Sequence, residues 1–117
     1  MIKKSEFKKA KIFSIKDGLE YLPNSVVIKS IVWKNTGEVR AISFDSGEVL
    51  IGKTSPFDTL LQIIDGNAEI IIDEQSNLLE NGECIIIPAH ANNIIKANVR
   101  FKMLSVIIKS GYDEISI

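Results

Sequence analysis

The stretch IIIPAHANNII, residues 85–95, contains the only histidine of the chain, His90. An imidazole binds metal ions and titrates near neutral pH, so His90 is the first residue to consider for chemistry. A first-row divalent metal needs three or four donors from His, Cys or carboxylate side chains. His90 with a nearby carboxylate such as Asp58 would be a poor metal site. His90 alone is therefore weak evidence for a metal site.

Short strands must position any functional side chain in this sequence. Glycine with Asn or Asp marks tight turns at residues 35–37, 45–47, 65–66 and 81–82. Runs rich in Ile and Val lie between them, as is typical of strands. The predicted strands are 26–34, 38–44, 48–53, 57–64, 68–73, 83–88, 92–97 and 101–109. Strands with turns every 8–12 residues indicate a sandwich or barrel.

Alternation within the last run predicts which side chains face the core. Val99, Phe101 and Met103 fall on one face, and Arg100 and Lys102 on the other. This is the pattern of a strand with one buried face.

One short helix is expected before the first strand. Ser14 is a fair N-cap with Asp17 three residues later, and the segment extends to about Leu22. Gly18 weakens this helix and Pro23 ends it. We predict an N-terminal arm and short helix in residues 1–24 and a barrel in residues 25–117, within a single domain.

Composition narrows the function classes. The net charge of the 117 residues is −1, which gives no general field for nucleic acid or a membrane surface. Hydrophobic residues make up 45% and charged residues 25%, enough for a core and a soluble surface. Lysines crowd the first eleven residues, and we expect a solvated end there.

We expect a cytoplasmic location. No apolar run approaches the ~20 residues of a membrane span, and the N-terminus lacks the features of a signal peptide. The one cysteine, Cys84, has no internal partner for a disulfide. It opens the apolar run CIII and is expected to pack as a small hydrophobe.

From Gly47 to Ala97 the sequence resembles the conserved region of the cupins, of the small single-domain bacterial type. Their first motif, G-x5-H-x-H-x3–4-E-x6-G, can be laid without a gap on GEVLIGKTSPFDTLLQIIDG, and the second, G-x5-P-x-G-x2-H-x3-N, on GECIIIPAHANNIIKA. The turn residues Gly47, Gly66, Gly82 and Pro88 match. The resemblance implies an all-β double-stranded β-helix, or jelly-roll, barrel.

The metal-ligand positions of the cupin motifs are replaced in this chain. By the resemblance, the three histidines and the glutamate correspond to Asn93, Lys53, Ser55 and Thr59. Lysine is protonated near neutral pH and repels a cation, while hydroxyls and a neutral amide are weak ligands. We expect no metal cofactor. His90 falls on the glycine of the P-x-G turn, away from the ligand position.

The replaced positions leave a polar patch that we expect inside the barrel. Lys53 could pair with an anion or act as a base or Schiff-base amine, or its ammonium could reach water at the barrel mouth. Ser55, Thr59 and Asn93 could hydrogen-bond one another or contact a ligand. Phe57 could cover or line the cavity. With His90, these residues are the candidate pocket residues.

We expect a metal-free barrel that binds a small molecule or serves in assembly, without catalysis. The alternative is a cupin enzyme, either a metal-dependent dioxygenase or isomerase with an atypical site, or a metal-independent enzyme that uses Lys53. The run LLQII, residues 60–64, is apolar on both faces, which suits a strand that also meets a partner chain. We therefore expect a homodimer.

Overall fold

The computed structural model describes residues 7–109, which form nine β-strands and no helix. Residues 1–6 of the predicted arm and 110–117 of the predicted barrel lie outside the described residues. The strands are β1 (Val26–Lys34), β2 (Gly37–Phe44), β3 (Val49–Gly52), β4 (Thr59–Asp65), β5 (Ala68–Ile72), β6 (Gln75–Leu79), β7 (Cys84–Ile87), β8 (Asn93–Lys96) and β9 (Phe101–Ile108). Each of the eight predicted strands overlaps one of them.

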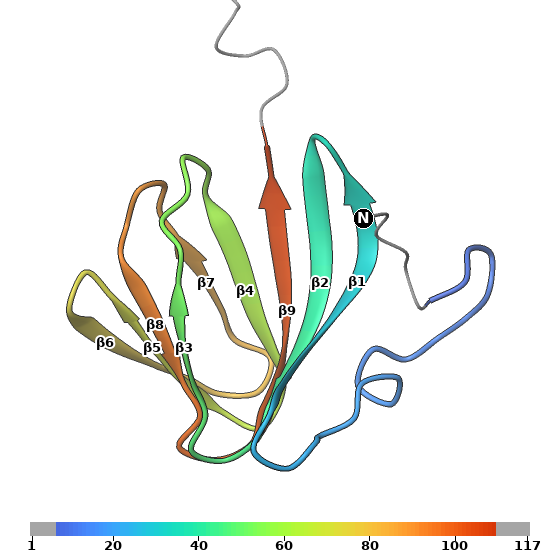
Figure 1. Cartoon of the computed structure of the whole chain (residues 1–117), viewed down its shortest axis with the longest axis horizontal. Helices are drawn as coiled ribbons and strands as arrows, with labels where there is room; N and C mark the ends of the chain where they lie inside the picture. Colours follow the sequence, from blue (N-terminus) through green and yellow to red (C-terminus); the bar gives the residue numbers. More distant parts are fainter. Residues whose placement is uncertain (1–6, 110–117) are drawn as a thin grey trace, which may run out of the picture.

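Two antiparallel sheets face each other and diverge towards the upper end of Figure 1. One sheet has the order β1-β2-β9-β4-β7 and the other the order β3-β8-β5-β6. Across residues 7–109, no strand of one sheet is hydrogen-bonded to a strand of the other. The all-β class is confirmed, but the barrel is not closed by hydrogen bonds. With no helix in the described part, no helix there could cross a membrane.

The core lies between the sheets, and its aromatic pair lies at the lower end of Figure 1, where β2 ends and β9 begins. Phe44 of β2 and Phe101 of β9 are register partners, and their rings stack with centroids 4.6 Å apart. Ile63 and Ile70 join the same buried cluster from the two sheets. The predicted alternation in β9 is confirmed within the strand, because Phe101 and Met103 both belong to this cluster. Val99 precedes the strand and is exposed.

Strand β6 was not predicted, because QSNLL is polar and mostly exposed. It pairs with β5 through a hairpin whose two turn residues, Asp73 and Glu74, have φ angles of 47° and 70°. Two positive φ values are typical of a type I′ turn, which matches the twist of the flanking strands. Glutamate is an uncommon residue in such a turn, so the sequence carries a weak hairpin signal here.

The predicted N-terminal helix is wrong. Ser14 does begin a turn, since its hydroxyl accepts a hydrogen bond from Asp17 N at 3.2 Å and its carbonyl accepts one from Gly18 N at 2.8 Å. The turn does not continue, because Gly18 disfavours helix and Pro23 follows closely. Leu19 is instead fully buried. Tertiary burial of this side chain outweighs the weak local preference for a helix.

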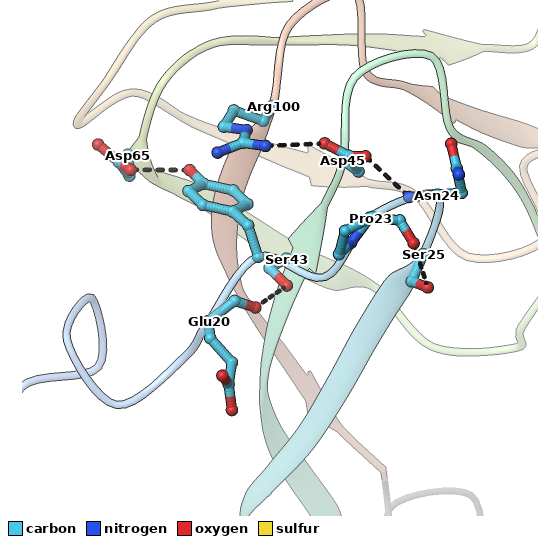
Figure 2. A network of polar contacts seen from close by, with 9 residues as sticks. Glu20, Pro23, Asn24, Ser25, Ser43, Asp45, Asp65 and Arg100 are labelled. Atoms are coloured by element: carbon cyan, nitrogen blue, oxygen red, sulfur yellow. Dashed lines mark hydrogen bonds and ion pairs between the residues drawn. The ribbon is translucent and has the colours of Figure 1, made fainter.

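Residues 14–25 form an N-terminal strap that crosses the outer face of the first sheet. Figure 2 shows its polar attachments, including Ser43 Oγ, which donates to Glu20 O at 2.8 Å. Tyr21 donates its hydroxyl to Asp65 Oδ2 at 2.7 Å, and Arg100 lies over the Tyr21 ring. Burial and the Asp65 carboxylate raise the pKa of Tyr21, and the hydroxyl lowers the pKa of Asp65. The strap is thus held by both packing and charge.

Candidate functional site

A cavity of about 380 Å³ opens between the two sheets, above the packed core. A volume of this size lies within the usual range of small-molecule sites. Its apolar wall includes Ile42, Leu61, Ile87, Ile95 and Met103, contributed by both sheets. Its polar lining consists of Arg40, Lys53, Ser55, Thr59, Asn93 and Ser105.

Strand pairing brings the polar lining together. The loop 53–58 leaves β3 at Gly52, and Gly52 is the register partner of Asn93 at the start of β8. Thr59 begins β4 directly after this loop. In Figure 1 the β3–β4 and β7–β8 connections lie at the same end of the molecule as the β1–β2 hairpin. Segments about 40 residues apart in the sequence therefore contribute to one rim.

Asn93 is buried and lies against the backbone of Gly52. A side-chain carbon on Gly52 would overlap Asn93 Oδ1 and would lie 2.6 Å from Asn93 Cγ. Only glycine leaves room for the amide at this point in the strand. No hydrogen bond from the amide to another group was found across residues 7–109, and none of the enclosed side-chain polar atoms there lacks a partner. The amide therefore faces the open space of the cavity.

The loop before β4 is held by a second set of hydrogen bonds. Ser55 Oγ accepts a hydrogen bond from Phe57 N at 3.1 Å, and Ser55 O accepts one from His90 N at 2.6 Å. Asp58 Oδ1 accepts a hydrogen bond from Ala89 N at 2.8 Å. Asp58 therefore stabilises the neighbouring loop and does not line the cavity. Phe57 does line it.

His90 is a turn residue, as predicted. Its φ angle is 68°, in the region that glycine adopts readily. Its side chain is exposed and does not line the cavity. The structure thus brings together Lys53, Ser55, Phe57, Thr59 and Asn93, and it leaves His90 outside the group. This agrees with a glycine-like position in a P-x-G turn.

Sequence reasoning missed two polar residues of the cavity, Arg40 and Ser105. They are register partners on β2 and β9. Ser105 is only 4% exposed. The signal for Arg40 was present, since EVRAISF places it on the same face as Ile42 and Phe44 by simple alternation. Alternation along β9 likewise places Ser105 on the same face as Phe101 and Met103.

The charge of the cavity lining has one sign. Arg40 and Lys53 are its two cations, and no Asp or Glu is among the described residues that line it. Glu38 lies on the same face of β2, two residues from Arg40, but it does not line the cavity. Lys53 is exposed, so its ammonium lies at the open end. The cavity thus combines two positive charges with neutral hydrogen-bonding groups and an apolar wall.

The residues present do not fit the divalent metal ion that the resemblance to metal-binding cupins would imply. Lys53, Ser55, Thr59 and Asn93, at the four ligand positions, all line the cavity, and none is histidine or carboxylate. In the part of the chain that the structure describes, no three His, Cys, Asp or Glu side chains group closely enough to hold a metal ion. Two cations and three weak donors do not make a site for a first-row metal.

Comparison with known proteins points to one fold. No protein-family model matches the sequence, and no curated protein matches it. Among solved structures, a conserved protein of unknown function from Streptococcus pyogenes is similar, with a TM-score of 0.85 and 25% identity over 95% of this chain and 97% of that chain. The two structures therefore match over almost their whole length.

Two further similar structures are those of cupins. A cupin superfamily protein from Desulfitobacterium hafniense has a TM-score of 0.83 and 24% identity, over 91% of this chain and 97% of that one. A cupin 2 conserved barrel domain protein from Leptotrichia buccalis has a TM-score of 0.80 and 28% identity, over 83% of this chain and 47% of that one. This chain therefore corresponds to about half of the Leptotrichia protein.

Proposed function

Because the chain has the cupin fold, we propose that it is a barrel that binds a small organic molecule in its cavity, without a metal and without catalysis. The observation that carries this proposal is the pair of buried polar side chains, Asn93 and Ser105, that face a largely apolar cavity. No enclosed side-chain polar atom of the described residues lacks a partner, so the polar atoms of Asn93 and Ser105 are open to the cavity and accessible to a ligand. A bound molecule with complementary groups would supply the partners that the described residues do not.

The alternative is an enzyme of the cupin type. A metal-dependent dioxygenase or isomerase would need the donors that Lys53, Ser55, Thr59 and Asn93 do not provide. A metal-independent reaction would use Lys53 as base or amine. The exposure of Lys53 supports a position in water at the cavity mouth instead. Non-catalytic binding therefore has the better support.

The binding proposal is tested by closing the cavity. Thr59→Trp places a large ring at its rim, while Gln62→Trp, three residues further along β4, adds the same ring to the outer face. Tag-free wild type should show one small molecule per chain by native mass spectrometry, or a raised melting temperature with members of a small-molecule panel. Thr59→Trp should lower binding by about 10-fold or more, and Gln62→Trp should leave it unchanged.

Two outcomes count against the binding proposal. Binding that survives Thr59→Trp in a folded protein would place the ligand elsewhere. A wild-type protein that neither retains a small molecule nor responds to the panel would have no ligand of the size that the cavity admits. Circular dichroism of both variants provides the control for folding.

We also propose a homodimer through the outer face of the first sheet. One apolar residue per strand forms a continuous outer row in register, namely Val32, Val39, Val106, Leu60 and Ile86. The N-terminal strap covers the other half of this face, where Ala41 and Ser43 are buried. A twofold axis would place the bare outer row against its copy. Cys84 is exposed, so the prediction that it packs as a small hydrophobe is wrong. We also propose a cytoplasmic location, because a lone cysteine agrees with a reducing compartment.

A charge in the outer row should separate the dimer. Ile86 is 58% exposed, so Ile86→Lys should fold normally yet lose the partner, because the contact would bury a lysine ammonium among apolar side chains. Leu78→Lys, at an exposed position of β6 in the other sheet, is the matched control. Sedimentation velocity should give a dimer for wild type and Leu78→Lys and a monomer for Ile86→Lys. A wild-type monomer, or an unchanged Ile86→Lys dimer, contradicts this interface.

A further inference from the structure

The two cations of the cavity differ in their surroundings. Lys53 lies at the exposed rim, whereas Arg40 is half-buried on the inner face of β2, between its register partners Ser30 and Ser105. No ion pair or hydrogen bond of the Arg40 side chain was found within residues 7–109. A guanidinium that is partly removed from water and has no anionic partner is costly. An anion at this point would remove that cost.

Neutral donors surround the same space. The Asn93 amide and the Ser105 hydroxyl are 8% and 4% exposed as residues, and both line the cavity. Neither has a side-chain hydrogen bond within the described residues, and Thr59 adds a further hydroxyl. Guanidinium, ammonium, amide and hydroxyl groups all donate hydrogen bonds. The lining is therefore rich in donors and contains no competing carboxylate.

The rest of the cavity is apolar. Ile42, Leu61, Ile87, Ile95 and Met103 line it, and all are nearly inaccessible to solvent. Such a surface binds hydrocarbon and excludes a second charged or strongly hydrated group. The ligand that suits this arrangement has one anionic end and one apolar end.

We infer that the cavity selects a small organic monocarboxylate, whose carboxylate is bound by Arg40 with help from Lys53 and whose apolar part lies on the buried wall. This inference rests on the proposed binding function and adds the ligand class to it. A planar carboxylate matches the fork of a guanidinium with two parallel hydrogen bonds. A phosphate ester also binds guanidinium and ammonium groups, but it carries more charge and hydration than a carboxylate, which the mostly apolar wall suits less well.

Matched pairs of probes test the ligand class. A set of straight-chain and phenyl-substituted monocarboxylates of four to ten carbons is compared with the corresponding primary amides, which have nearly the same shape and no charge. Binding is measured with the full-length protein by NMR chemical-shift titration. At least one carboxylate should bind about 10-fold or more tightly than its amide, since hydrogen bonds to charged groups are the stronger ones.

Variants then assign the selectivity to Arg40. Arg40→Met keeps the apolar stem and should lower carboxylate affinity by about 10-fold or more while leaving the amide unchanged. Arg40→Lys keeps the charge and should recover part of the loss. Arg100→Met removes the same charge outside the cavity, where Arg100 bonds Asp45, and should change neither affinity.

Each contrary result has a distinct meaning. Carboxylates and amides that bind equally well, with no effect of Arg40→Met, overturn the ligand class and leave cavity binding intact. Binding that persists in Thr59→Trp overturns both proposals. An alkyl phosphate that binds more tightly than every carboxylate overturns the choice of carboxylate. If no member of the set binds, no monocarboxylate of suitable size is the ligand, and the inference fails.

Discussion

Phe101→Ala should lower the free energy of unfolding by about 3–5 kcal/mol, the usual cost of removing a buried aromatic ring. Phe101 is 0% exposed, and its ring stacks on Phe44 with an interplanar angle of 12°. The substitution removes this stack and leaves a void at the lower end of the barrel. Urea denaturation followed by circular dichroism measures the loss. For a chain of this length it corresponds to a fall in melting temperature of about 10–20 °C.

The matched control for Phe101→Ala is Ile107→Ala, on the same face of the same strand. Ile107 lines the cavity and is half-buried, so less packed surface is lost, and we expect a cost of about 1 kcal/mol. The difference between the two losses of unfolding free energy shows whether side chains are packed more closely around Phe101 than around Ile107, which lines the cavity. Equal costs would mean that the cavity is filled by packed side chains, and the proposed binding site would lose its basis.

Gly52→Ala should destabilise the protein by about 1–3 kcal/mol through overpacking. The added methyl group overlaps the buried Asn93 amide, which occupies the space above the Gly52 backbone. In an Asn93→Ala background that space is free. There the same substitution should be neutral or stabilising by about 0.5 kcal/mol, because alanine restricts the unfolded chain more than glycine does.

The double-mutant cycle of Gly52 and Asn93 isolates their contact. We expect a coupling free energy of about 1–3.5 kcal/mol from urea denaturation of the wild type, both single variants and the double variant. Gly52→Ala should also weaken binding of the carboxylate probe, since it displaces the Asn93 amide from the cavity wall. Additive effects on stability would show that Asn93 does not lie over Gly52, which would remove Asn93 from the proposed site.

Local sequence determined most of the strands and the turns between them. Gly47, Gly66 and Gly82 all have positive φ angles, between 78° and 89°, as their Asn and Asp neighbours indicated. Period-two alternation in β9 placed Phe101 and Met103 in the core. Both are short-range properties, because a turn depends on a few consecutive backbone angles and a strand face on every second residue.

The motif register also placed Lys53, Ser55, Thr59 and Asn93 in one group. These residues line one cavity in the structure, although Asn93 lies 34 positions after Thr59 in the sequence. The spacing sufficed because the turns between the motifs have set lengths. The motif register could not identify Arg40, because this residue lies before the first motif. Only its alternation with Ile42 on β2 indicated that it faces the inside of the barrel.

Only the tertiary structure decided the remaining features, because they depend on partners distant in the sequence. The polar strand β6 forms because β5 supplies its hydrogen bonds. The segment after Ser14 makes one turn and then continues as an irregular strap and not a helix, because Leu19 is buried and Tyr21 bonds Asp65, 44 residues away. Ser105 lies beside Arg40 because β9 pairs with β2. These long-range contacts outweigh local preference, and they also bring together the donors of the proposed carboxylate site.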